Sequence, residues 1–341
     1  MSKATTDSLT TGALLTALVV IFALASVYLP FASQLFLIMA AVPLSVLYAK
    51  FNFKITMLSA VSAVILVFLL SGLSGLLPTL LLAVPLGLVS GFMFHKRQKA
   101  APTLLVSILT TSLGIVALLT VTMQLMGLSF QDFLDTIFPP YDELMKIYTD
   151  LGLLAAAEAQ SVDLEAIKEM YNRGIAFSTR LLPAIILCVG AILSGIHYFV
   201  TVKILKRLHI KVRKFPRFDH WYLPAYYAYG LVIALILFTC RDFLPYKWLN
   251  ILSSNLLAIY AIALFIVGLS VIAKWLNLRK QSRGMKFLWF FCLFLLLSST
   301  FGLYILITVA IFGAFDMLMD FRHIHPNDPL LPKLKKNSKQ P

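Results

Sequence analysis

Charged residues are scarce in this sequence. Only 13% of its 341 residues are Asp, Glu, Lys or Arg, whereas a soluble globular protein carries about a quarter. Hydrophobic residues make up 60% of the chain. This imbalance excludes a protein whose main solvent is water. Each apolar run of ~20 residues then counts as one membrane crossing.

Acidic residues are scarcer than basic ones. The chain has 15 Asp and Glu against 29 Lys and Arg, which gives a formal charge of +14. The basic residues lie in short hydrophilic gaps between apolar runs, and no nucleic-acid-binding motif accompanies them. This pattern excludes nucleic acid as the expected partner. It predicts contact with the acidic headgroups of a lipid bilayer.

Metal-binding and catalytic motifs are also missing. Cys188, Cys240 and Cys292 lie inside apolar runs without partners at motif spacing, so neither a disulfide nor a metal site is expected. The sequence contains no G-x-S-x-G, H-E-x-x-H, G-x-G-x-x-G or Walker A motif. We therefore expect no enzymatic activity and no cofactor. Any energised transport would need a separate ATPase.

Long apolar runs are what the sequence does contain, and they predict an all-α polytopic membrane protein with about ten transmembrane helices. The first run is longer than the apolar part of a secretory signal, so we expect it to be retained as a span. The predicted spans are residues 9–29, 31–49, 54–71, 75–94, 102–127, 176–202, 222–240, 248–273, 286–299 and 302–319.

Loop charge predicts the orientation of these spans. In the ten-span topology, the basic residues of 203–217, of 274–286 and of the tail after Arg322 all fall on one side of the membrane. That side is cytoplasmic by the positive-inside rule. Residues 286–319 could form one long helix or a hairpin. The basic tail favours the hairpin, and both termini are then cytoplasmic.

The longest hydrophilic segment, residues 128–175, carries nine acidic and three basic residues. Pro139 and Pro140 interrupt it, and apolar residues recur at helical spacing on both sides of a gap with capping residues Ser161 and Asp163. We predict two amphipathic helices on the extracytoplasmic side. They either cap the helix bundle or form a lid over an outward-facing ligand cavity.

Two polar residues lie near the predicted outer ends of spans. Gln124 belongs to the fifth span and Arg180 to the sixth. Polar groups inside a membrane are costly and therefore mark candidate sites. Together these side chains would suit an anionic or amide-bearing ligand. Alternatively, Arg180 only reaches the outer headgroups or pairs with a loop carboxylate.

Other polar residues have simpler interpretations. His197 and Tyr198 are interpreted as residues of the membrane interface. Asp316 and Asp320 stand one helical turn apart, with Arg322 just beyond, and a local ion pair is expected.

Small residues at helical spacing predict close helix packing. Ala13 and Ala17 are four residues apart in the first span, as are Gly87 and Gly91 in the fourth, and Gly190 belongs to a similar set in the sixth. Helices associate in lipid through such faces, because lipid tails provide no hydrophobic drive for pairing.

Three segments carry a family resemblance, namely Gly12–Ala17, Phe215–Pro224 and Phe312–Arg322. Through them the chain resembles the YybS family of bacterial membrane proteins over essentially its whole length. This resemblance implies a bacterial cell membrane as its location.

The first six spans also resemble the S components of energy-coupling factor vitamin transporters. The resemblance implies an S-component-like six-helix bundle over residues 1–206, including the loop 128–175, followed by a four-span part over 207–341. In S components an A-x-x-x-A face docks on a transmembrane coupling protein that works with an ATPase. Ala13 and Ala17 occupy that spacing here.

Two functions follow from this resemblance. The first is a solute-binding membrane subunit that relies on a separate energising partner. The second is a non-catalytic scaffold of a membrane or envelope-assembly complex, since a related fold occurs in the elongation scaffold MreD.

Overall fold

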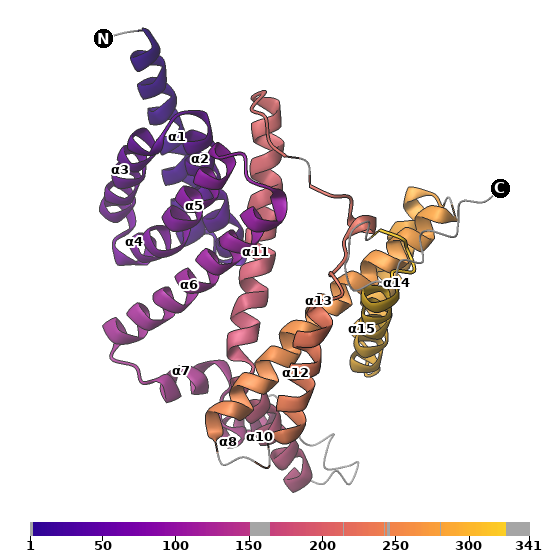
Figure 1. Ribbon diagram of the computed structural model, residues 1–341. Coiled ribbons are helices and arrows are strands. Elements are labelled where there is room, and N and C mark those ends of the chain that lie inside the picture. The colour runs from indigo at the N-terminus through magenta and orange to yellow at the C-terminus, as the bar shows by residue number, and fades with distance from the viewer. Residues whose placement is uncertain are drawn as a thin grey trace, which may run out of the picture. The chain divides into compact units, whose positions relative to one another are not determined.

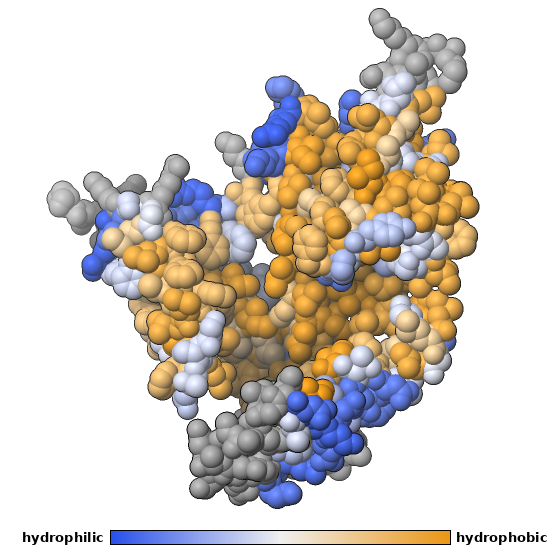
Figure 2. Space-filling model, turned by 180° about the vertical axis from the view of Figure 1, so that it is seen from behind, coloured by the Kyte–Doolittle hydropathy of each residue, from blue (hydrophilic) through white to orange (hydrophobic). Residues whose placement is uncertain are grey.

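The computed structural model describes residues 3–150, 164–213, 215–241, 243, 246–279 and 281–324 (Figure 1). The regular elements within these ranges are helices, which confirms the all-α class. Eight of the described helical segments are long and apolar enough to cross a membrane, and two apolar helices are shorter. Many large hydrophobic side chains are exposed on the helices, and hydrophobic residues cover much of the face seen in Figure 2. A polytopic membrane protein fits these properties.

The chain divides into two compact units, residues 1–215 and 216–341. The expected boundary lay between residues 206 and 207. Six of the candidate spans belong to the first unit. They are formed by α1 (Lys3–Tyr28), α2 (Ser33–Lys50), α3 (Phe53–Ser71), α4 (Leu73–Pro78) continuing into α5 (Val84–His95), α6 (Ala100–Met126) and α11 (Leu182–Arg207).

Local sequence sets the ends of these helices. Asn52 caps α3 by accepting the Ile55 backbone N–H at 3.1 Å. Gly72 and Gly127 end α3 and α6 with φ values of 65° and 67°, a region that glycine adopts without strain. Between α4 and α5 the chain forms a π-helical turn at Thr79–Ala83. Pro85 follows this turn and has no N–H to continue the regular α-helical ladder.

Small residues bring the helices of the first unit together. A side chain at Gly87 would meet Leu44 and Ala41 of α2, and one at Gly91 would meet Tyr48. Gly190 of α11 faces Ser112 of α6 in the same way. The predicted packing role of these glycines is confirmed.

The 128–175 segment contains two amphipathic helices after Pro139–Pro140, as predicted, and a third, shorter one before these prolines. They are α7 (Phe130–Ile137), α8 (Tyr141–Asp150) and α10 (Leu164–Arg180), and Pro139–Pro140 separates α7 from α8. Lys168 of α10 pairs with Asp142 of α8 at 3.1 Å, so the two helices are joined. The predicted caps Ser161 and Asp163 lie outside the described residues.

The second unit contains α12 (Tyr227–Cys240), α13 (Lys247–Leu278), α14 (Arg283–Leu297) and α15 (Gly302–Met319). A short 3-10 turn, η3 (Phe218–His220), precedes them. The 32 residues of α13 span about 48 Å, which exceeds the ~30 Å hydrocarbon core. A helix of this length fits a bilayer by tilting or by extending past the hydrocarbon core.

Residues 286–319 form a hairpin rather than one long helix. Lys286 near the start of α14 contacts Asn277, and Arg322 just after α15 contacts Ser270, so both ends of the segment reach the same end of α13. The segment therefore begins and ends at the same end of α13. The basic residues after Arg322 that motivated this prediction, Lys333 to Lys339, lie outside the described residues.

Candidate functional site

A buried ion pair lies in the second unit, where α15 ends. The Arg322 guanidinium contacts the Asp316 carboxylate at 2.7 and 2.9 Å, in a two-point geometry that suits this pair. Both side chains are almost fully buried, at 4% and 0% exposure. Asp320 ends α15 in the left-handed conformation (φ 44°), which turns the chain so that Arg322 lies over Asp316. The expected local ion pair is confirmed.

The same guanidinium connects α15 to the segment before α12. Arg322 donates to the backbone oxygen of Trp221 at 2.7 Å and to that of Asp219 at 3.2 Å. It also donates to the Ser270 hydroxyl at 2.6 Å, and this hydroxyl donates to the Phe218 oxygen. Arg322 therefore ties together segments about a hundred residues apart and fixes the position of η3.

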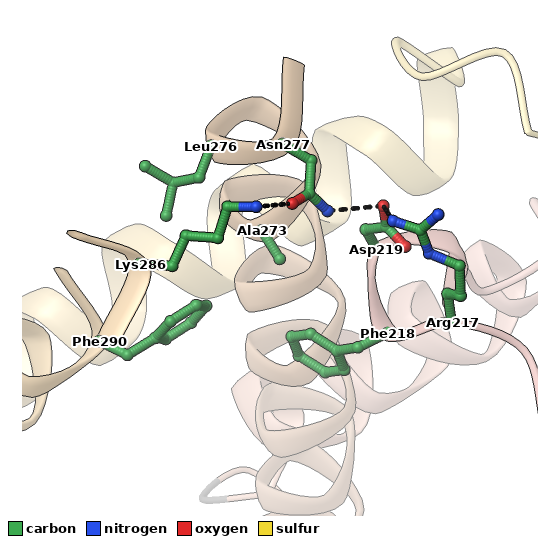
Figure 3. Close-up of a pocket in the computed structure, with 8 residues that line it drawn as sticks. All are labelled: Arg217, Phe218, Asp219, Ala273, Leu276, Asn277, Lys286 and Phe290. Atoms are coloured by element: carbon green, nitrogen blue, oxygen red, sulfur yellow. Dashed lines mark hydrogen bonds and ion pairs between the residues drawn. The ribbon is translucent and has the colours of Figure 1, made fainter. Parts of the chain in front are cut away.

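Asp219 organises a second layer of polar groups beside this ion pair. Asn277 of α13 donates to its Oδ2 at 2.7 Å, His220 Nδ1 lies 2.9 Å from its Oδ1, and Arg217 lies 3.2 Å from Oδ2. Asn277 in turn accepts a hydrogen bond from Lys286 of α14. The result is a row from Lys286 through Asn277 and Asp219 to Arg217 (Figure 3).

This row borders a pocket of about 340 Å³, which we call the Asp219 pocket. The side chains of Phe218 and Phe290 lie on one side of the row (Figure 3), and Ala273 and Leu276 of α13 complete the apolar lining. A small pocket with apolar walls and a few convergent polar groups is the usual form of a small-molecule site.

The Asp219 carboxylate is held in its charged form. Burial by itself would raise its pKa, but the hydrogen bonds from His220 and Asn277 and the positive charges of His220 and Arg217 outweigh burial. The pKa of Asp219 therefore lies below its ordinary value. The charged carboxylate orders Asn277, and through it Lys286.

We expect Asp219→Asn to lower the free energy of unfolding by about 1–3 kcal/mol at neutral pH, because hydrogen bonds to a charged group are lost. A carboxyl whose folded pKa is depressed stabilises the protein above its unfolded pKa. That contribution is lost as pH falls through the folded pKa, so the difference between wild type and variant should close in acid. Thermal melting of detergent-solubilised protein between about pH 3 and pH 7 measures this.

Asp135→Asn is the matched control, because Asp135 is an exposed carboxylate of α7 in the other unit. A wild-type-to-Asp219→Asn difference that stayed constant across the acid range would contradict the assigned role of the carboxylate.

Lys286 is the cation in this site that the surrounding acids leave unmatched. Its ammonium contacts the amide oxygen of Asn277, and within the described ranges no carboxylate pairs with it. The side chain is half-buried and lines the pocket. A half-buried ammonium held by a neutral partner attracts an anionic group.

Comparison with known proteins then identifies the family. The family described as "Predicted membrane protein (DUF2232)" matches residues 17–317. The chain belongs to this family. The matched region contains Asp219, Asn277, Lys286 and Asp316, and it ends before Arg322. No curated protein and no solved structure matches the chain.

The ligand-binding and docking residues predicted from the sequence of this family member lie in the first unit, and none of them lines the Asp219 pocket. Gln124 is exposed in the last turn of α6, and Arg180 is exposed at the last position of α10, just before α11 begins. Neither lines the Asp219 pocket or the apolar groove between α1, α2 and α11 that is described below. Ala13 and Ala17 are exposed on one face of α1, where another helix could pack. Their roles in ligand binding and docking stay predictions.

The interpretation of His197 and Tyr198 as interface residues is wrong. Their exposures are 0% and 2%. His197 Nε2 lies 3.0 Å from the Ser45 hydroxyl of α2, which shares a 2.7 Å hydrogen bond with Ser90 of α5. A polar contact among three packed helices, rather than nearness to the helix end, decides the position of His197.

Sequence reasoning did not predict the Asp219 pocket. The segment Phe215–Pro224 stood out for its family resemblance, yet nothing in it indicated Asn277 or Lys286 as neighbours. The only sign of a site in the sequence was that charged residues lie between the predicted spans 176–202 and 222–240.

Proposed function

We propose that this protein is a non-catalytic solute-binding membrane subunit that holds an anionic ligand in the Asp219 pocket of its second unit. The half-buried Lys286 ammonium, which has only a neutral partner within the described ranges, carries this proposal. Removing a charge from water is costly unless an opposite charge compensates it. A ligand carboxylate or phosphate would supply that charge.

The remaining lining suits a small molecule with an apolar part. The pocket of about 340 Å³ falls within the ~300–1,000 Å³ range of small-ligand sites. Arg217 at its edge has a side chain that is 75% exposed, and its guanidinium keeps donors that the single contact to Asp219 does not use. Phe218 and Phe290 offer ring faces to an apolar group.

The geometry supports binding over catalysis. His220 and Asp219 form a pair that resembles part of a nucleophilic triad, but catalysis of that kind needs a nucleophile beside the histidine. The nearby Ser270 hydroxyl is fully buried and already bonded to Arg322 and to the Phe218 oxygen. It serves the structure of the site.

Energised uptake would require a partner, which the exposed Ala13/Ala17 face of α1 would dock. The same face supports the alternative function of a scaffold in a membrane assembly. The two functions differ in the pocket, because a scaffold requires no ligand there.

We expect anionic solutes to raise the melting temperature of the full-length protein in mild detergent. The probes are inorganic phosphate, a short monocarboxylate and an aromatic carboxylate. A ligand present at a hundred times its Kd stabilises the folded state by about 2.7 kcal/mol. The variants Lys286→Met and Arg217→Met should lose most of this effect, because each removes a cation and keeps an apolar stem.

Lys146→Met is the matched control, since Lys146 is an exposed lysine of α8 in the other unit. It should respond to the anions as the wild type does. A panel without any stabilising anion, in a protein that retains stable protein neighbours after gentle purification, would favour the scaffold function instead.

A further inference from the structure

A second cavity lies in the first unit, and its lining is almost entirely apolar. This α1–α2–α11 groove has a volume of about 460 Å³. Leu14 and Leu18 line it from α1, Val46 from α2, and Val200 and Ile204 from α11. Because these helices are candidate membrane spans, the groove lies within the part of the first unit that can be surrounded by lipid.

The groove has one polar end. Thr11, Lys50 and Leu208 lie at the ends of their lining segments, and α1 and α2 run in opposite directions, so these three positions mark the same end. Phe22 and Met39 lie at the other, apolar end. The polar end belongs to the basic side of the protein, which the positive-inside rule places in the cytoplasm.

The length of the groove matches one leaflet. From Thr11 to Phe22 the α1 helix rises about 16 Å, at 1.5 Å per residue. One leaflet contributes half of the ~30 Å hydrocarbon core. An acyl chain lying along the groove would therefore extend from the interface to the middle of the bilayer.

The polar end carries positive charge. The Lys50 ammonium lies 4.9 Å from the centre of the Phe51 ring, and within the described ranges no carboxylate pairs with it. Arg207 is exposed on α11 three residues after Ile204, so it lies on the groove side of that helix. Both cations would meet the phosphate of a lipid whose chain fills the groove.

We infer that the α1–α2–α11 groove binds one phospholipid with an anionic headgroup, its acyl chain against Leu18 and Val200 and its phosphate at Lys50. The apolar lining accounts for the chain, and the unpaired cation accounts for the headgroup preference. This lipid site is separate from the proposed solute pocket, which belongs to the other unit.

The test uses full-length protein in nanodiscs of phosphatidylcholine, with or without phosphatidylglycerol, and native mass spectrometry of lipids that remain bound after release into mild detergent. We expect phosphatidylglycerol to be retained in preference to phosphatidylcholine. Lys50→Gln should weaken this preference about fivefold, the factor for one basic residue near an anionic headgroup. Val200→Trp should fill the groove and reduce retention of both lipids.

Two matched controls use the same substitutions outside the groove. Lys54→Gln removes an exposed lysine at the start of α3, and Val189→Trp enlarges an exposed residue of α11. Both should retain lipid as the wild type does. Equal retention of the two phospholipids, or equal losses in Lys50→Gln and Lys54→Gln, would overturn the proposal. So would a Val200→Trp variant that loses a bound protein helix or a second copy of the chain and keeps its lipid.

Discussion

Asp316→Ala is expected to destabilise the second unit by about 3–5 kcal/mol, because it leaves the buried Arg322 guanidinium without its counter-charge. Arg322 cannot turn to water, since its side chain is 4% exposed and is also held by Ser270 and the Trp221 oxygen. A loss of this size is a large fraction of the roughly 5–15 kcal/mol that stabilises a folded domain. Thermal melting of the purified variant in detergent measures the effect.

An exposed ion pair provides the comparison. Glu169 and Arg173 of α10 form a similar contact, but their side chains are 66% and 76% exposed. Glu169→Ala should cost less than about 1 kcal/mol, because water solvates the remaining arginine. Similar losses for Asp316→Ala and Glu169→Ala would show that burial of the Asp316–Arg322 pair has no special energetic weight.

A double variant separates the ion pair from the other contacts. If Arg322→Met is added to Asp316→Ala, no charge remains buried, and the combined loss should be smaller than the sum of the two single losses. Strict additivity would mean that the two side chains are not coupled.

Gly313→Leu is expected to separate α13 from α15. A Cβ at Gly313 would overlap the backbone oxygen of Leu264, and one at Gly268 would overlap that of Val309. Neither obstacle is a flexible side chain, so the helices themselves must move. We expect a loss of about 3 kcal/mol or more, at or above the upper end for overpacking. A lower melting temperature and an aggregated fraction on size exclusion would report it.

Gly195→Leu is the control for this substitution. Gly195 lies in a membrane-spanning helix, α11, but a side chain there would meet nothing within 4 Å. The control tests whether leucine in place of a helical glycine is harmful in general. If Gly195→Leu and Gly313→Leu were equally destabilising, close approach of α13 and α15 would not explain the effect.

Some parts of the site were within reach of sequence reasoning. Asp316 and Arg322 are six residues apart, so a local turn at a helix end suffices to join them, and their pairing was predicted. Arg322 and the Trp221 oxygen are separated by 101 positions in the chain. Only the packing of α15 against α13 brings these two groups together, and no periodicity records that packing.

The spacing of glycines likewise predicted close helix contacts only where both glycines lie on the same helix. The four-residue spacing of Gly87 and Gly91 predicted a close helix contact, and α2 provides it. Gly268 and Gly313 lie on different helices, 45 positions apart, and neither belongs to a pattern that names the other. His197 shows the same limit, since its position near a helix end suggested the interface and its contact with Ser45 placed it in the core.

The sequence by itself determined the membrane class, the approximate spans and the amphipathic helices of the 128–175 segment, and it favoured the hairpin at 286–319, because a bilayer acts on each segment according to its own hydropathy and loop charge. Tertiary structure alone decided which polar groups share a site. Lys286, Asn277 and Asp219 belong to three separate segments. They meet because polar groups in a low-dielectric environment must find partners, and helix packing determines which partners lie within reach.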